Sequence, residues 1–182
     1  AQIQGFFSVP FDHLFAMPVL LEHMRQNYSP DTAVIVSPDA GGVERARAYA
    51  KRFGGSLAII DKRRPMPNVA QIMNIIGEVD GRDCIILDDM IDTAGTLSEA
   101  AYALKAKGAQ RIVAYATHPV LSGPAIDRLM QAPLEKIIVS DSIPLMGDAR
   151  TCPKIEVLSI APLLAKALRR IHLGESVSSL FV

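Results

Sequence analysis

Two carboxylates and a loop of small hydroxyl-bearing residues follow one short apolar segment of the chain. Cys84–Leu87 is apolar and rich in isoleucine, which predicts a buried strand closed by Asp88 and Asp89. The DTAGT loop then precedes a helical spacing of apolar residues that ends at Gly108. Backbone N–H groups at a helix N-terminus attract anions, and threonine hydroxyls add donors. The loop comprises Asp92, Thr93, Ala94, Gly95 and Thr96.

This arrangement suits a sugar phosphate. The loop would donate hydrogen bonds to a phosphomonoester, while Asp88 and Asp89 would accept hydrogen bonds from neighbouring sugar hydroxyls. The alternative is an ordinary turn between a strand and a helix, with a threonine N-cap and solvated carboxylates. The sequence leaves both interpretations open at this point.

A second glycine-containing turn follows the predicted strand Thr32–Ser37. Its residues are Asp39, Ala40, Gly41 and Gly42, and the two glycines would let the backbone approach a phosphate closely. Asp39 is the only carboxylate in the turn. Mg²⁺ prefers one or two carboxylates plus phosphate oxygens, so Asp39 is the candidate metal ligand. The alternative is a turn in which Asp39 bonds its own backbone.

A basic segment follows the second predicted strand of the chain, Ser56–Asp61. Lys62–Asn68 carries three cations and two prolines, which predicts a solvated loop. Such a loop could be a lid whose cations neutralise a polyphosphate, or simply a solubilising surface loop. The candidate catalytic residues are Lys62, a point charge, and Arg64, a planar fork for two oxygens.

The remaining elements predict an α/β protein with a doubly wound, mainly parallel sheet flanked by helices, because strands alternate with helices of about ten residues. In such a sheet the ligand lies at the carboxyl ends of the strands. The segment 69–79 is expected to be extended and irregular. The other predicted helices are Met17–Arg25, Gly42–Phe53, Leu97–Lys107, Gly123–Met130 and Ala161–Ile171, and the other predicted strands are Arg111–Thr117, Lys136–Ser140 and Ile155–Ser159.

The charge balance, the length of the apolar runs and the number of cysteines exclude several kinds of partner and location. Of 182 residues, 19 are Lys or Arg and 19 are Asp or Glu, so the formal net charge is zero and no basic stripe predicts a nucleic-acid partner. No apolar run is long enough to predict a membrane span. Cys84 and Cys152 do not make a disulfide framework, so we expect packed, reduced thiols and a cytoplasmic protein.

Several motifs together resemble a known family. DDMIDTAGT resembles the phosphoribosyl pyrophosphate-binding signature shared by type I phosphoribosyltransferases and ribose-phosphate diphosphokinases. SPDAGG, DKRR, NIIGEVDGR, YATHPVLSG and GESVSSLF extend the resemblance, in order, to the C-terminal half of the ribose-phosphate diphosphokinase family. A nucleotide-salvage phosphoribosyltransferase, which would share only the signature loop, and a non-catalytic regulatory module are the alternatives.

The resemblance implies a reaction and a set of roles. The family moves the diphosphoryl group of Mg-ATP to the anomeric hydroxyl of ribose 5-phosphate, giving phosphoribosyl pyrophosphate and AMP. By position, Asp92–Thr96 would hold the 5-phosphate, Asp88 and Asp89 the ribose hydroxyls, and Asp39–Gly42 the pyrophosphate and Mg²⁺. Lys62 and Arg64 would stabilise the transferring β-phosphoryl group, with Arg64 also contacting substrate.

The resemblance also implies a missing part. The expected organisation is 1–30 as an inter-half segment, 31–160 as the sugar-phosphate domain and 161–182 as a C-terminal helix and tail. An N-terminal half, which supplies adenine contacts in the family, would precede the segment, whether the chain is a fragment of a full synthetase or half of a split enzyme. We therefore expect an incomplete ATP site, a homo-oligomer and exposed apolar residues, namely Ile3, Phe6, Phe7, Leu180 and Phe181.

We expect none of the histidines His13, His23 and His118 to take part in the transfer step itself. His13 and His23 are expected to be surface residues. His118 is expected to follow a strand, and the resemblance places it in a region that holds an effector phosphate.

Overall fold

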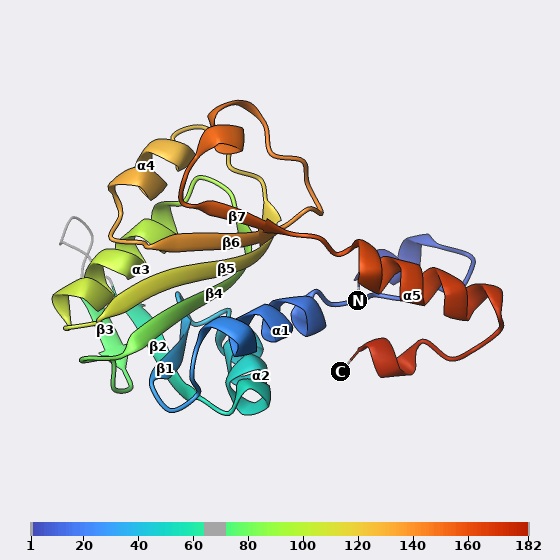
Figure 1. The fold of residues 1–182 in the computed structure, drawn as a ribbon, viewed down its shortest axis with the longest axis horizontal. Coiled ribbons are helices and arrows are strands. Elements are labelled where there is room, and N and C mark those ends of the chain that lie inside the picture. Colours follow the sequence, from blue (N-terminus) through green and yellow to red (C-terminus); the bar gives the residue numbers. More distant parts are fainter. Residues whose placement is uncertain (1, 64–71, 182) are drawn as a thin grey trace.

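The computed structural model describes residues 2–63 and 72–181, and in this part of the chain seven strands form one sheet (Figure 1). The strand order is β3-β2-β1-β4-β5-β6-β7, and every neighbouring pair is parallel except β2 and β3. The strands are β1 Ala33–Ser37, β2 Ser56–Arg63, β3 Ile72–Ile76, β4 Asp83–Ile91, β5 Arg111–Pro119, β6 Lys136–Ser140 and β7 Ile155–Leu158.

Helices cover both faces of the sheet. α1 and α2 pack on one face with one buried apolar cluster, and α3 and α4 pack on the other with a second cluster. The alternation along β1 explains the two layers, since Val34 and Val36 join one cluster while Ala33 and Ile35 join the other. The helices are α1 Met17–Asn27, α2 Val43–Phe53, α3 Gly95–Ala106, α4 Ala125–Gln131 and α5 Ala161–His172, and the 3₁₀ turns are η1 Gln2–Phe6, η2 Gly147–Thr151 and η3 Ser178–Leu180.

The first and last parts of the described chain lie together, to one side of the sheet (Figure 1). The ring of Phe15 meets that of Phe181 edge to face, with centroids 6.5 Å apart. A cavity of about 420 Å³ between the N-terminal segment and α5 is lined by Phe11 and Leu14 on one side and by Leu168 on the other. The apolar side chains of Phe6 and Leu168 remain 86% and 68% exposed.

The predicted fold class is confirmed, but three element boundaries are wrong. β2 continues through Lys62 and Arg63, so the basic segment begins within a strand and not in a loop. The segment 69–79, expected to be extended and irregular, is extended at Ile72–Ile76 but regular there, because these residues form β3 and pair antiparallel with β2. β4 continues past Asp88 and Asp89 to Ile91, because β5 extends alongside and pairs with it as far as Pro119.

The sequence also led to expectations for the two cysteines, the apolar residues near both ends of the chain and membrane-spanning helices. Cys84 and Cys152 are both free and buried, as predicted. Ile3, Phe6 and Phe7 are exposed, as predicted, whereas Leu180 and Phe181 are half-buried. No helix within residues 2–63 and 72–181 is both long and apolar enough to cross a membrane.

Candidate functional site

Two loops meet where the strand order of the sheet changes direction. β1 lies between β2 and β4, so the loops after β1 and β4 leave adjacent parallel strands at their carboxyl ends. This switch point is where doubly wound sheets bind ligands. A cavity of about 160 Å³ opens there, and Asp39, Asp88 and the whole loop Asp92–Thr96 line it. The structure thus brings together carboxylates and a phosphate-type loop that the sequence analysis selected separately.

The loop Asp92–Thr96 is held from outside by the segment that follows β5. Ser122 Oγ donates to Asp92 Oδ1, and the backbone N–H of Ser122 donates to the Asp92 carbonyl at 3.1 Å. Arg128 Nη1 donates to the Thr93 carbonyl at 2.9 Å. These contacts fix the loop by its carbonyls and its one carboxylate, so its N–H groups are not consumed by them.

Helix α3 begins without a side-chain cap. Its N-cap is Ala94, which has a left-handed φ of +58°, and no side chain of residues 2–63 and 72–181 caps the first turn. The alternative of a threonine N-cap is therefore wrong. Because side chains often satisfy the first N–H groups of a helix, their lack here leaves an N-terminus suited to an anion. Thr93 and Thr96 are exposed beside it.

The loop after β1 is organised by its own side chains. Asp39 Oδ1 accepts the Gly42 N–H at 2.9 Å, and Ser37 Oγ donates to the Asp39 carbonyl at 2.7 Å. The alternative in which Asp39 bonds local backbone is thus observed for one carboxylate oxygen. A Cβ on Gly42 would stand 2.9 Å from Ser37 Oγ, so close packing requires glycine there.

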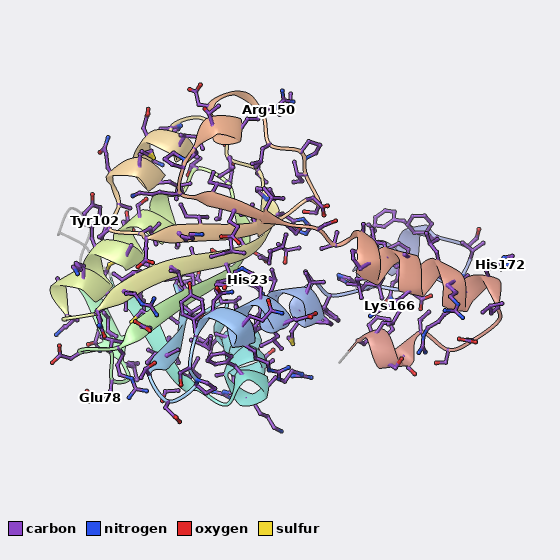
Figure 2. The ribbon with its side chains drawn as sticks, viewed as in Figure 1. His23, Glu78, Tyr102, Arg150, Lys166 and His172 are labelled. Carbon is purple, nitrogen blue, oxygen red and sulfur yellow. The ribbon has the colours of Figure 1, made fainter. Side chains whose placement is uncertain are left out.

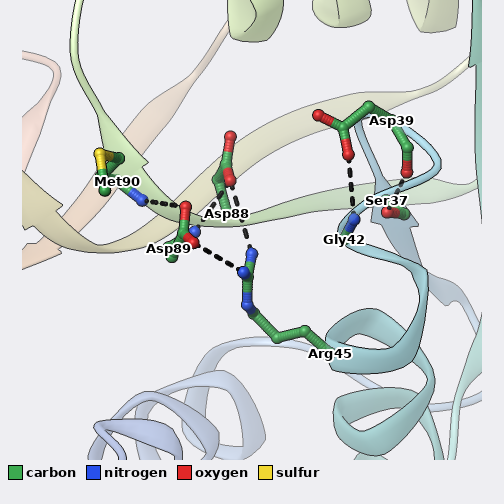
Figure 3. A network of polar contacts seen from close by, with 7 residues as sticks. All are labelled: Ser37, Asp39, Gly42, Arg45, Asp88, Asp89 and Met90. Atoms are coloured by element: carbon green, nitrogen blue, oxygen red, sulfur yellow. Dashed lines mark hydrogen bonds and ion pairs between the residues drawn. The ribbon is translucent and has the colours of Figure 1, made fainter. Parts of the chain in front are cut away.

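Asp88 and Asp89 are joined by a residue that the sequence analysis missed (Figure 3). Arg45, in the first turn of α2, donates from Nη2 to Asp89 Oδ2 at 2.8 Å, and its Nη1 lies 3.5 Å from Asp88 Oδ1. Burial raises the pKa of Asp88 to about 6; the Asp89 N–H and Arg45 oppose the rise, and the Asp89 carboxyl adds to it. The available signal was position, because Arg45 follows Gly42 by three residues and so lies on the same side of the helix.

The side chains of the predicted catalytic cations, Lys62 and Arg64, lie outside the described part of the structure. Arg64 lies outside the described residues. The structure describes Lys62 by its backbone, which belongs to β2.

Among the histidines, the prediction for His23 is wrong. Its side chain is only 17% exposed where α1 meets the sheet (Figure 2). Nδ1 lies 2.7 Å from the Tyr115 hydroxyl and Nε2 lies 3.1 Å from Glu156 Oε1, so it is a structural residue. His13 is exposed, as predicted. His118 lies within β5 and not after it, with Nδ1 2.9 Å from Ser142 Oγ.

A larger cavity, of about 580 Å³, borders the same end of β4. Asp89, Arg45 and His118 line it beside the N-terminal segment and Phe181, and Met90 borders both cavities. Within the described residues, no three His, Cys, Asp or Glu side chains form a group able to hold a metal ion. A metal at this edge would therefore need oxygen ligands from a bound phosphate as well as from the protein.

In sequence and in structure, this chain is similar to proteins of one family. A family model described as phosphoribosyl synthetase-associated domain matches residues 62–182. A ribose-phosphate pyrophosphokinase of Xanthomonas campestris pv. campestris is 58% identical over 100% of this chain and 57% of its own length. The crystal structure of phosphoribosylpyrophosphate synthetase from Mycobacterium smegmatis has a TM-score of 0.85 and 40% identity, covering 95% of this chain and 56% of that one.

A more distant structure shares the fold alone. Orotate phosphoribosyltransferase from Aeropyrum pernix has a TM-score of 0.54 at 17% identity, covering 85% of this chain and 74% of that one. The chain spans about half the length of the curated relatives it matches, 57% and 56% in two cases.

Proposed function

Since the chain belongs to the phosphoribosyl synthetase-associated domain family, we propose that it is the C-terminal half of a ribose-phosphate diphosphokinase. The observation that carries the proposal is the cavity at the sheet edge, where Asp39, Asp88 and the loop Asp92–Thr96 face one another. A salvage phosphoribosyltransferase is the weaker candidate, because the likeness to a phosphoribosyltransferase of known structure, the orotate enzyme, extends to the fold and not to the sequence.

The proposed reaction forms one bond and breaks one. The anomeric oxygen of ribose 5-phosphate bonds to the β-phosphorus of ATP, the bond between that phosphorus and the oxygen bridging to the α-phosphorus breaks, and AMP leaves. The hydroxyl proton passes to water. Such transfers depend mainly on positioning and on neutralising charge.

Each loop has a separate task in this proposal. Asp92–Thr96 hold the 5-phosphate with N–H groups and hydroxyls, and Asp88 and Asp89 orient the ribose by accepting from its hydroxyls. Asp39–Gly42 receive the diphosphoryl group. Lys62 and Arg64 supply positive charge to it during transfer, although the structure does not describe their side chains.

The residues fit magnesium bound together with a substrate. Asp39 has one oxygen engaged by Gly42 N–H and borders the cavity, so its carboxylate can serve as one ligand. Mg²⁺ usually takes one or two carboxylates plus phosphate oxygens and water. When bound, it would supply positive charge to the phosphates of ATP.

Exposed apolar side chains suggest where further subunits and an N-terminal half would pack against this chain. Ile3 and Phe7 are each 50% exposed, and Phe6 and Leu168 more so, which favours association with further copies and with an N-terminal half that supplies adenine contacts. We expect light scattering to give a mass above the 19.7 kDa monomer at micromolar concentration. A monomeric mass would contradict this part. A cytoplasmic location remains a prediction.

Calorimetry and product analysis test the proposal. Ribose 5-phosphate should bind the purified chain, and Asp92→Ala should abolish binding, whereas Asp127→Ala, an exposed carboxylate on α4, should leave it unchanged. With Mg-ATP and ribose 5-phosphate together, ³¹P NMR should detect little AMP until the N-terminal half of a relative is added. Failure of ribose 5-phosphate to bind would refute the sugar site.

Two other outcomes have distinct meanings. AMP production by the chain alone would show that its ATP site is complete and that our view of a missing half is wrong. Sugar binding without AMP, even after the N-terminal half is added, would favour the non-catalytic regulatory module.

A further inference from the structure

Arg45 lies between the loop after β1 and the acidic pair Asp88–Asp89 in β4. Its side chain reaches from the first turn of α2 to the acidic pair at the end of β4, with Nη2 2.8 Å from Asp89 Oδ2 and Nη1 3.5 Å from Asp88 Oδ1. The same Nη1 lies 3.8 Å from where a Cβ on Gly42 would stand. The guanidinium therefore lies beside the loop after β1 and the acidic pair at once (Figure 3).

The acidic pair needs a cation. Asp88 and Asp89 are consecutive, and Asp39 and Asp92 border the same cavity as Asp88, so an anionic sugar phosphate would meet several carboxylates there. The burial that raises the pKa of Asp88 to about 6 also makes its charged form costly. Among charged side chains of the described residues, Arg45 is the one for which ion pairs with both aspartates are recorded.

The orientation of both carboxylates is fixed as well. Asp88 Oδ1 accepts the Asp89 N–H, and Asp89 Oδ1 accepts the Met90 N–H, each at 2.9 Å. Arg45 then contacts Oδ1 of Asp88 and Oδ2 of Asp89. Asp88 Oδ2 takes part in none of these contacts and Asp88 lines the cavity, so this oxygen can accept a hydrogen bond from a bound sugar.

We propose that Arg45 is a positioning residue of the ribose site, which acts through Asp88 and Asp89 and not by contact with the phosphate. This inference rests on the proposed function. Without the guanidinium the two carboxylates repel each other, and Asp88 takes up a proton or turns toward solvent. Either change weakens the hydrogen bonds that the pair accepts from ribose hydroxyls, while leaving the donors of Asp92–Thr96 in place.

Two sugars separate this role from a structural one. Ribose 5-phosphate and 2-deoxyribose 5-phosphate carry the same phosphate, but the second lacks one hydroxyl. Arg45→Met should weaken ribose 5-phosphate binding about tenfold and 2-deoxyribose 5-phosphate binding much less, because hydrogen bonds to charged groups contribute the difference. The preference for the 2-hydroxyl should therefore nearly vanish. Arg45→Lys, which keeps the charge, should restore part of it.

Controls separate the possible failures. Arg47→Met removes an exposed cation from the same helix and should leave both affinities unchanged. Equal weakening of both sugars by Arg45→Met would mean direct phosphate contact or lost structure, and would overturn the inference. An unchanged preference would overturn it too. If the unaltered chain binds neither sugar, the proposed function fails, and the role of Arg45 at the ribose fails with it.

Discussion

Replacing Gly42 by alanine adds one methyl group at the tightest point of the loop after β1. The backbone of Gly42 has φ −84° and ψ −3°, which alanine adopts readily, so the substitution causes no backbone strain. The new Cβ would stand 2.9 Å from Ser37 Oγ. Real Cβ contacts of that length are essentially never seen, so either the serine or the loop must move.

The expected loss of stability can be worked out from the contacts that hold Ser37 in place. Ser37 is fully buried, and its hydroxyl donates to the Asp39 carbonyl at 2.7 Å. Turning the hydroxyl away breaks that bond, which costs about 1 kcal/mol, and leaving a buried polar group unpaired raises the cost to about 1–3 kcal/mol. We therefore expect the free energy of unfolding of Gly42→Ala to fall by about 2 kcal/mol, with displacement of Asp39.

Two assays and a matched variant test this reasoning. Urea denaturation measures the loss of stability, and calorimetry with pyrophosphate and Mg²⁺ measures binding, which we expect to weaken at least about tenfold as the loop shifts. For stability, Gly41→Ala is the control, because its Cβ would meet Asp39 Oδ1 at an ordinary 3.4 Å. Gly42→Ala with unchanged stability and unchanged pyrophosphate binding would refute the account of this loop.

Three further substitutions test the scaffold. Asp83→Asn removes a carboxylate held by Arg111 at 2.6 and 2.9 Å, an interaction that lowers the pKa of Asp83 from its ordinary value of 3.8. The variant should lose about 1 kcal/mol at pH 7, and thermal denaturation across pH should show this difference from wild type shrinking below pH 3.8 and vanishing as the pH falls through the lowered pKa of the folded protein. Lys154→Met removes donations to three carbonyls at and after the end of α4, at 2.8–3.0 Å, and should cost about 2 kcal/mol in urea denaturation, whereas the exposed Lys166→Met should cost nothing; equal effects would contradict a specific cap. Gly77→Ala forces a Cβ to within 2.8 Å of a β2 carbonyl at a φ of +114° and should cost more than about 2 kcal/mol, so a variant as stable as wild type would contradict the described pairing of β3.

The alternation of strands and helices, and the small-residue loops after two strands, allowed the doubly wound fold and the location of the candidate site to be predicted. Both follow from local sequence, since a short apolar run, a glycine-containing turn and a helical spacing are each contiguous. The meeting of Asp39 with the loop Asp92–Thr96 required one further rule, that parallel strands end at the same edge.

The roles of Arg45 and His23 were not predicted, because they depend on contacts between residues far apart in the sequence. Arg45 pairs with Asp89, 44 positions away, and His23 contacts Tyr115 and Glu156, 92 and 133 positions away. No local pattern encodes such partners. The continuation of β4 through Asp88 was missed because carboxylates are rare in strands, and here the extension of β5 decides it.

β3 was missed for a similar reason. Its sequence IMNII has no alternation, and β3 lies at the edge of the sheet, where among the described residues it pairs with one strand, β2. A strand of this kind is specified by its neighbour and by the turn that leads to it, more than by its own residues.

Backbone NMR with ribose 5-phosphate tests the central claim most directly. The claim is that the helix N-terminus at Asp92–Thr96 binds the phosphate of this sugar. The account predicts that the amide resonances of Thr93–Thr96 shift first and saturably on titration. Shifts confined to the larger cavity, at His13 and Phe181, or no shifts at all, would contradict it.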